Sequence, residues 1–156
     1  MTTIADMLAD FNRSQQEFLG FLDNVAPDTL YKQTGENWSV AQTLAHISEA
    51  REFFAGEVQR IVATPGAQVG RTIEDPHRLE SIAAHSHSSL DELRERLVVS
   101  YQAVVQTLQG VNEDDLSLEC DYINRGSFKL AEFIRRFVVG HDQIHLQQVI
   151  ELSQSN

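Results

Sequence analysis

Two histidines near the end of the sequence, His141 and His145 in the segment HDQIH, have the spacing of metal ligands on a helix. Four residues turn an α-helix through about 400°, so the two imidazoles lie above one another on one face. A third histidine, His46, lies far upstream. Three neutral imidazoles suit zinc, nickel or ferrous iron, and they leave at least one coordination position open. The residues therefore predict an open divalent-metal site, which is typical of catalytic centres.

The helix that carries the pair is expected to continue an apolar stripe. That stripe contains Leu130, Ile134, Phe137, His141, His145 and Gln148. A buried polar ring without a partner costs about 1 to 3 kcal/mol, so histidines in leucine positions need a bonding partner. The alternative to a metal, for His46 in particular, is an ordinary core histidine bonded to a backbone carbonyl or a carboxylate.

Four long amphipathic segments are expected to form the helices that position these residues. They cover roughly residues 3–26, 39–64, 89–110 and 127–152, with N-terminal caps at Thr2 or Thr3, Ser39, Ser89 and Ser127. Four such stripes are most simply buried together in an all-α four-helix bundle, with residues 1–156 as a single domain. If the second helix packs against the fourth, His46 faces His141 and His145 across a cavity.

Two connections interrupt the helical pattern. Residues 66–88 are polar, contain three histidines and are unusually long for a bundle connection, with a short helix expected over residues 76–84. Residues 111–126 are acidic and rich in turn residues, and alternating apolar residues there fit either a short extended piece or irregular structure.

The composition of the chain limits the classes of molecule that it is expected to bind. Twelve Lys and Arg against 23 Asp and Glu give a net charge of −11, which repels polyanions, so no nucleic-acid partner is expected. Cys120 is the single cysteine, so no internal disulfide can form, and we interpret it as a small packed side chain rather than a nucleophile. The sequence has neither a signal-peptide pattern nor a stretch of transmembrane length. These features predict a cytoplasmic protein without a membrane partner.

Other side chains that could do chemistry have ordinary interpretations. His77, His85 and His87 lie in the long connection and lack an obvious partner, so we interpret them as solvated residues. Arg135 and Arg136 fall beside the histidine face of the fourth helix. They are interpreted as solvated helix arginines, with the binding of an anionic substrate as the alternative.

Two known metal signatures do not fit HDQIH. Zinc peptidases with H-E-x-x-H need a glutamate where this chain has the shorter Asp142, and their third ligand normally lies further along the chain. After His145 the chain contains no further histidine, and Glu151 is its only glutamate that could serve as such a third ligand. Di-iron bundles need Glu-x-x-His on two helices, a pattern that the chain lacks. A mononuclear site is the better interpretation.

Two stretches of the sequence, one around His46 and one around His141 and His145, resemble the DinB-like, or YfiT-like, four-helix-bundle metalloproteins. The likeness lies in Asn37-Trp38-Ser39-Val40, Leu44-Ala45-His46-Ile47, His141-Asp142, His145 and Gln148, and it covers nearly the whole chain. The resemblance implies that His46, His141 and His145 bind a divalent metal, with water completing the shell. The chain differs from related sequences at Leu146-Gln147, where a basic residue and a glycine are often found, and in the long connection.

The resemblance also implies a range of functions. Members include S-transferases that use low-molecular-weight thiols and a thiol-dependent isomerase. Our leading hypothesis is therefore a metal-dependent enzyme that acts on a small molecule, such as a thiol-dependent S-transferase. A metal-dependent hydrolase is the alternative enzyme, since a bound water can serve as nucleophile. A non-catalytic metal-binding or stress-related protein, or a homodimer-forming module with structural histidines, is the alternative outside catalysis.

Three residues next to the predicted ligands have secondary roles in these hypotheses. Glu49 lies one turn from His46, and Asp142 adjoins His141, so either could accept a ligand's second ring N–H. Ordinary solvent exposure is the simpler expectation for both. Trp38 is expected to pack as an aromatic anchor at the start of the second helix, in preference to stacking on a substrate.

Overall fold

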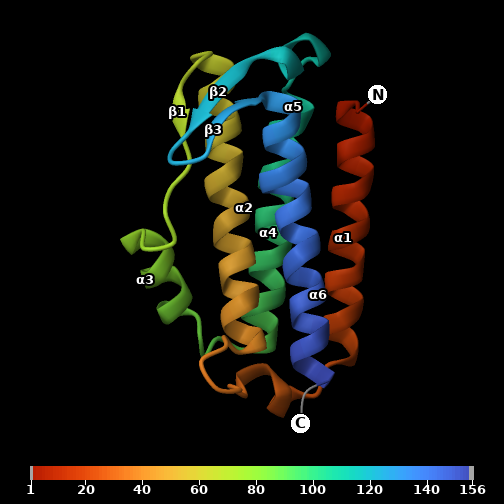
Figure 1. Ribbon diagram of the computed structural model, residues 1–156. Helices are drawn as coiled ribbons and strands as arrows, with labels where there is room; N and C mark the ends of the chain where they lie inside the picture. The colour runs from red at the N-terminus through yellow and green to blue at the C-terminus, as the bar shows by residue number, and fades with distance from the viewer. Residues whose placement is uncertain (1, 155–156) are drawn as a thin grey trace.

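Four long helices packed side by side form the body of the structure, a computed structural model that describes residues 2–154 (Figure 1). The helices are α1 (Ile4–Asn24), α2 (Val40–Ala63), α3 (Pro76–Ala84), α4 (Leu90–Gln109), α5 (Leu130–Phe133) and α6 (Gly140–Gln154). Short 3-10 turns cover Pro27–Tyr31 and Glu113–Ser117, and a π-helical segment, Ile134–Val139, joins α5 to α6 in one rod. The predicted four-helix bundle is confirmed, with α1, α2, α4 and the α5–α6 rod as its members.

Helix α2 starts where its capping sequence predicts. The Ser39 hydroxyl accepts a hydrogen bond from the Gln42 amide, and the Gln42 side chain accepts one from the Ser39 amide in return. This reciprocal cap fixes the first turn of α2, two turns before His46.

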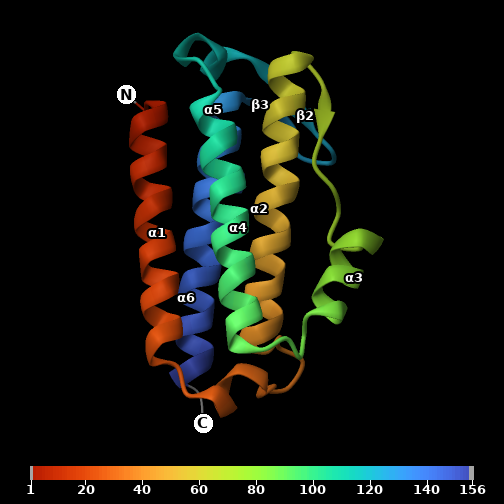
Figure 2. The same ribbon diagram turned by 180° about the vertical axis from the view of Figure 1, so that it is seen from behind.

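The long connection is explained by the direction of the helices. α2 and α4 run the same way along the bundle, so the chain after α2 must return along its full length before α4 begins (Figures 1 and 2). A helix of 24 residues is about 36 Å long, which a short loop cannot span. On its way back the chain forms α3, which packs beside α2 on the outer side of the bundle.

A small sheet closes one end of the bundle. Its strands are β1 (Gln68–Val69), β2 (Glu119–Tyr122) and β3 (Gly126–Lys129); β2 pairs in parallel with β1 and antiparallel with β3. The extended option for the acidic connection is therefore confirmed. The expected start of the fourth helix at Ser127 is wrong, because Ser127 pairs with Asp121 in the β2–β3 hairpin and the helix begins at Leu130. Strand pairing overrides the local capping signal here.

The π-helical segment changes the register of the last helix. Its wider turn holds one extra residue, and the amide of Gly140 donates to the carbonyl of Arg135, five residues earlier. The expected apolar stripe therefore does not continue unchanged. Beyond the π turn the buried positions are Asp142, Leu146 and Val149, while His141, His145 and Gln148 are half-buried. The histidines lie at the edge of the core, where they border a cavity.

Helix α2 is covered on more than one side, which explains its buried polar residues. The bundle covers one face, and α3 with the returning chain lies against another. His46, Glu49 and Arg51 are therefore all buried. Among the described residues, no helix combines the length and the apolar composition that crossing a membrane requires.

Candidate metal centre

His46, His141 and His145 meet between α2 and α6. The Nε2 atom of His141 lies 3.1 Å from the Nε2 atoms of both His46 and His145. One potential ligand atom from each residue falls within 4.8 Å of the others, and no second group of this kind occurs within residues 2–154. The structure thus brings together the three residues that the sequence indicated, from positions 95 residues apart in the chain.

The spacing of these nitrogens fits a shared metal ion. Metal–nitrogen bonds of about 2.0 to 2.1 Å in a tetrahedral site separate neighbouring ligand atoms by about 3.3 Å. Two nitrogen lone pairs 3.1 Å apart repel each other unless a proton or a cation lies between them. In addition, the Nδ1 atom of His46 is buried without a hydrogen-bond partner in the described part of the chain. No hydrogen bond from Nδ1 therefore fixes this ring in an orientation other than the one that faces the cluster.

All three rings are held neutral, as metal ligands must be. Burial, followed by repulsion from His141 and His145, lowers the pKa of His46 from 6.5 to about 2. Burial likewise lowers the pKa of His141 to about 3, with His145 and nearby arginines as further causes. The pKa of His145 is also lowered, again mainly by burial. Lone pairs for a metal are therefore available at neutral pH.

These pKa shifts predict that the metal-free protein loses stability as the pH falls below about 6.5. Above that pH His46 and His141 are neutral in both states, whereas below it they take up protons in the unfolded chain but stay neutral in the folded state down to about pH 3. The free energy of unfolding should then fall by roughly 1 kcal/mol per histidine per pH unit. Urea denaturation of chelator-treated protein between pH 7 and pH 5 measures this slope. A His46→Gln/His141→Gln variant should give a flatter profile, and an equally steep one would contradict the assignment.

Gln148 orients His145. Its Oε1 atom lies 2.7 Å from Nδ1 of His145, so Nδ1 carries the proton and Nε2 keeps the lone pair that faces His141. Sequence reasoning gave Gln148 no role of its own, although its spacing of three residues from His145 on a helix was the signal that could have assigned one.

Replacing Gln148 should therefore weaken metal binding without removing a ligand. We expect Gln148→Leu to lower zinc affinity by about 10- to 100-fold, the usual effect of losing a partner that holds a ligating imidazole. Competition with a chromophoric chelator measures the affinity. Gln147→Leu is the matched control, because Gln147 is exposed and bonds to Glu151 instead. Equal affinities in the two variants would contradict the role of Gln148.

A cavity of about 260 Å³ opens beside the three histidines. It is lined by His46, Phe54, Arg71, Thr72, Ile73, Arg78, Tyr122, Arg125, Phe137, His141 and His145. Besides the histidines, Phe54 and Phe137, the lining thus comes from the returning connection with α3 and from the β2–β3 hairpin. Sequence reasoning missed these arginines, since neither segment carries a periodic pattern that relates it to the bundle.

Trp38 packs against the site. Its ring lies 5.2 Å from the ring of His46, and the guanidinium of Arg78 lies 5.1 Å from the Trp38 ring centre. The expectation of an aromatic anchor at the start of α2 agrees with this position, which also shields one face of His46.

Glu49 and Asp142 are neither exposed nor bonded to ligand imidazoles, so both expectations for them were wrong. Glu49 is buried and holds both terminal nitrogens of Arg71. Asp142 is fully buried and forms a two-pronged ion pair with Arg51, at 2.9 Å and 2.7 Å. The chain buries each of these carboxylates because an arginine from elsewhere in the fold compensates it.

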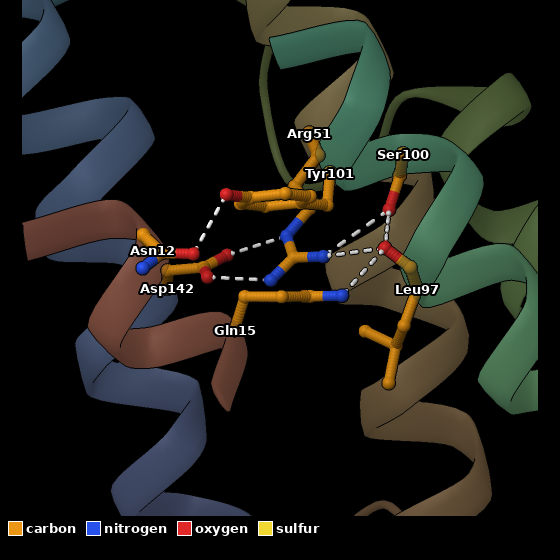
Figure 3. A network of polar contacts seen from close by, with 7 residues as sticks. All are labelled: Asn12, Gln15, Arg51, Leu97, Ser100, Tyr101 and Asp142. Atoms are coloured by element: carbon orange, nitrogen blue, oxygen red, sulfur yellow. Dashed lines mark hydrogen bonds and ion pairs between the residues drawn. The ribbon is translucent and has the colours of Figure 1, made fainter. Parts of the chain in front are cut away.

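The Arg51–Asp142 pair is the centre of a buried polar network that joins helices α1, α2, α4 and α6 (Figure 3). On α4, Nη1 of Arg51 donates to the Leu97 carbonyl at 2.9 Å and to the Ser100 hydroxyl at 3.3 Å. From α1, the side-chain amide of Gln15 donates to the same Leu97 carbonyl. Arg51 lies five residues after His46 on α2, and Asp142 directly follows His141 on α6. The network therefore connects α2 with α6 next to the histidine cluster.

The remaining histidines are separate from the metal centre. His77 and His87 are exposed, and His85 is half-buried with Nδ1 3.2 Å from the Ser88 hydroxyl. None of the three lines the histidine cavity in the described structure. Their interpretation as solvated residues agrees with the exposure of His77 and His87, whereas His85 is half-buried.

Cys120 and the two neighbouring arginines are also accounted for. Cys120 is buried, its thiol contacts the Phe128 carbonyl, and burial raises its pKa, so it lacks the properties of a nucleophile. Arg135 forms an ion pair with Asp10, and Arg136 packs over aromatic rings. Neither arginine is among the residues that line the histidine cavity.

The sequence pattern that defines the DinB superfamily matches residues 10–149 of this chain. Among proteins of curated function, none matches the sequence.

Solved structures share the fold at low sequence identity. The mycothiol-dependent maleylpyruvate isomerase is 19% identical with a TM-score of 0.69, and the match covers 96% of this chain and 63% of that chain. The present chain thus spans less than two thirds of that protein's length. The colibactin self-resistance protein ClbS, solved in complex with a dsDNA, is 13% identical with a TM-score of 0.72, over 100% and 98% of the two chains. TT2238, described as a four-helix bundle protein, is 15% identical with a TM-score of 0.70, over 96% and 99%.

Proposed function

The chain belongs to the DinB superfamily, and we propose that it is a metal-dependent enzyme in which His46, His141 and His145 bind one divalent ion and a small thiol is transferred to an electrophilic carbon. The observation that carries the proposal is the convergence of three neutral imidazoles on the wall of an open cavity. Zinc and nickel are the favoured ions for such a donor set, with ferrous iron as a third candidate.

The residues of the chain have distinct tasks in this reaction. The three histidines hold the ion, and Gln148 keeps His145 in the tautomer that binds it. Phe54 and Phe137 give the cavity an apolar side that limits the access of water to the reacting atoms. When bound, a divalent ion supplies a Lewis acid that lowers the pKa of a thiol or a water at its open position.

The nucleophilic thiol must come from a second substrate. The only cysteine of the sequence, Cys120, is 2% exposed, and its raised pKa disfavours the thiolate. In the transfer, the thiol loses its proton, a carbon–sulfur bond forms, and the leaving group departs with its bonding electrons. The thiol dependence named for the maleylpyruvate isomerase, which shares the fold, also favours this chemistry over hydrolysis.

The expected partners are small molecules. We expect no binding of nucleic acid, because a net charge of −11 opposes it, although ClbS shares the fold and was solved with a dsDNA. A cytoplasmic location and a possible homodimer remain predictions.

A thiol-transfer assay tests the proposal. Zinc- or nickel-loaded protein is incubated with a panel of low-molecular-weight thiols and a chromogenic alkylating acceptor, and the thioether product is quantified. We expect metal-dependent turnover that is lost in His141→Ala and retained in His87→Ala. Turnover that persists after complete removal of metal would overturn the mechanism, and metal-dependent hydrolysis of the acceptor in the absence of thiol would favour the hydrolase.

A further inference from the structure

The cavity beside the histidines is positively charged in a strongly acidic protein. Acidic residues outnumber basic ones by 23 to 12, yet the cavity is lined by three arginines, Arg71, Arg78 and Arg125, and by no carboxylate among the described residues. An excess of one charge in a partly enclosed cavity raises the local concentration of ligands of opposite charge. The cavity therefore favours an anion.

Two of the three arginines have no direct ion-pair partner, although Glu49 and Asp75 lie close enough to Arg78 to act on its charge. Arg71 forms a two-pronged ion pair with Glu49, so its charge is largely neutralised. Neither Arg78 nor Arg125 forms an ion pair with any residue between 2 and 154. The cavity wall thus presents two guanidinium groups without a direct counter-ion.

Aromatic rings hold both guanidinium groups in place while leaving most of their donors free. Arg125 lies 5.5 Å from the centre of the Tyr122 ring and 5.6 Å from that of Phe137. No side-chain hydrogen bond of Arg125 is present within the described structure. Arg78 lies over Trp38 and uses one nitrogen to bond the Ile73 carbonyl at 2.7 Å. Guanidinium groups that are fixed but unpaired are suited to bind a carboxylate or a phosphate.

We propose that Arg78 and Arg125 form an anion subsite that holds an oxyanion group of the substrate, a carboxylate or a phosphate, while its reacting atom faces the three histidines. The inference rests on the proposed function and names the substrate class of the same site. The cavity of about 260 Å³ has roughly the volume of nine waters, which limits the part of the substrate that it encloses to a small acid.

Calorimetric titration of the zinc-loaded protein tests the subsite. The probes are succinate and inorganic phosphate, with succinamide as the uncharged counterpart of succinate. We expect at least one anion to bind and succinamide not to bind. Arg125→Gln should weaken that binding at least tenfold, and Arg78→Gln should weaken it as well. Arg136→Gln is the matched control, because Arg136 also packs on Phe137 but does not line the cavity, and it should leave the affinity within twofold.

Two outcomes overturn the subsite: no binding of either anion at millimolar concentration, or equal affinities in wild type and Arg125→Gln. The anion that binds more tightly in an Arg125-dependent manner identifies the preferred group. Zinc content is measured in every sample. A wild-type chain that holds no zinc overturns the proposed function, whereas a zinc-loaded chain with Arg125-independent binding overturns the subsite alone.

Discussion

Arg51→Met is expected to lower the free energy of unfolding by about 3 to 5 kcal/mol, because it leaves the carboxylate of Asp142 buried without a counter-ion. Arg51 and Asp142 side chains are 2% and 1% exposed, so water cannot take the place of the lost partner. The loss should appear as a lower midpoint in urea denaturation with an unchanged slope.

The size of the effect follows from the number of bonds that Arg51 makes. It donates twice to Asp142, and also to the Leu97 carbonyl and the Ser100 hydroxyl. It further lies over the ring of Phe11, at 5.0 Å from the ring centre. One substitution therefore removes a link among α2, α4 and α6.

Two further variants separate the burial of charge from other causes. Arg94→Met breaks the ion pair with Asp23, whose side chain is 63% exposed, and should cost less than about 1 kcal/mol. Adding Asp142→Leu to Arg51→Met removes the uncompensated charge and should recover much of the lost stability. An Arg51→Met variant as stable as Arg94→Met would refute the role of the buried pair.

Removing the metal is the second change with a large expected effect. An ion at a concentration 1,000 times its Kd stabilises the native state by about 4 kcal/mol. For a chain of this size that corresponds to a thermal midpoint higher by roughly 8 to 16 °C. We therefore expect chelator to lower the midpoint of zinc-loaded wild type by about that amount.

The same treatment should leave His141→Ala almost unchanged, because that variant lacks the central ligand of the cluster. His77→Ala provides the control, since His77 is exposed on α3, and it should respond to chelator like the wild type. A shift of equal size in His141→Ala would mean that zinc stabilises the chain elsewhere.

The bundle and the three histidines were predictable because both depend on local helical patterns. The stripes of α1, α2 and α4 are regular, and the spacing of His141 and His145 needs only one helix turn. His46 could be added on the condition that the second helix packs against the fourth, and the structure meets this condition because α2 contacts α6.

The details that the sequence did not reveal depend on contacts between distant segments. The π turn before Gly140 shifts the register of α6 by one residue, and helical periodicity contains no sign of it. Asp142 looked like an exposed acid because its partner, Arg51, lies 91 residues away. Arg125 reaches the cavity through a hairpin whose pairing replaces the helix start expected at Ser127.

The central claim is that His46, His141 and His145 form one metal site, and elemental analysis of untagged protein tests it most directly. Protein equilibrated with zinc and then desalted should contain about one zinc per chain in wild type and in His77→Ala. His46→Ala, His141→Ala and His145→Ala should each retain less than about a tenth of that amount. If His46→Ala kept the zinc content of the wild type, the account of the metal centre would be wrong.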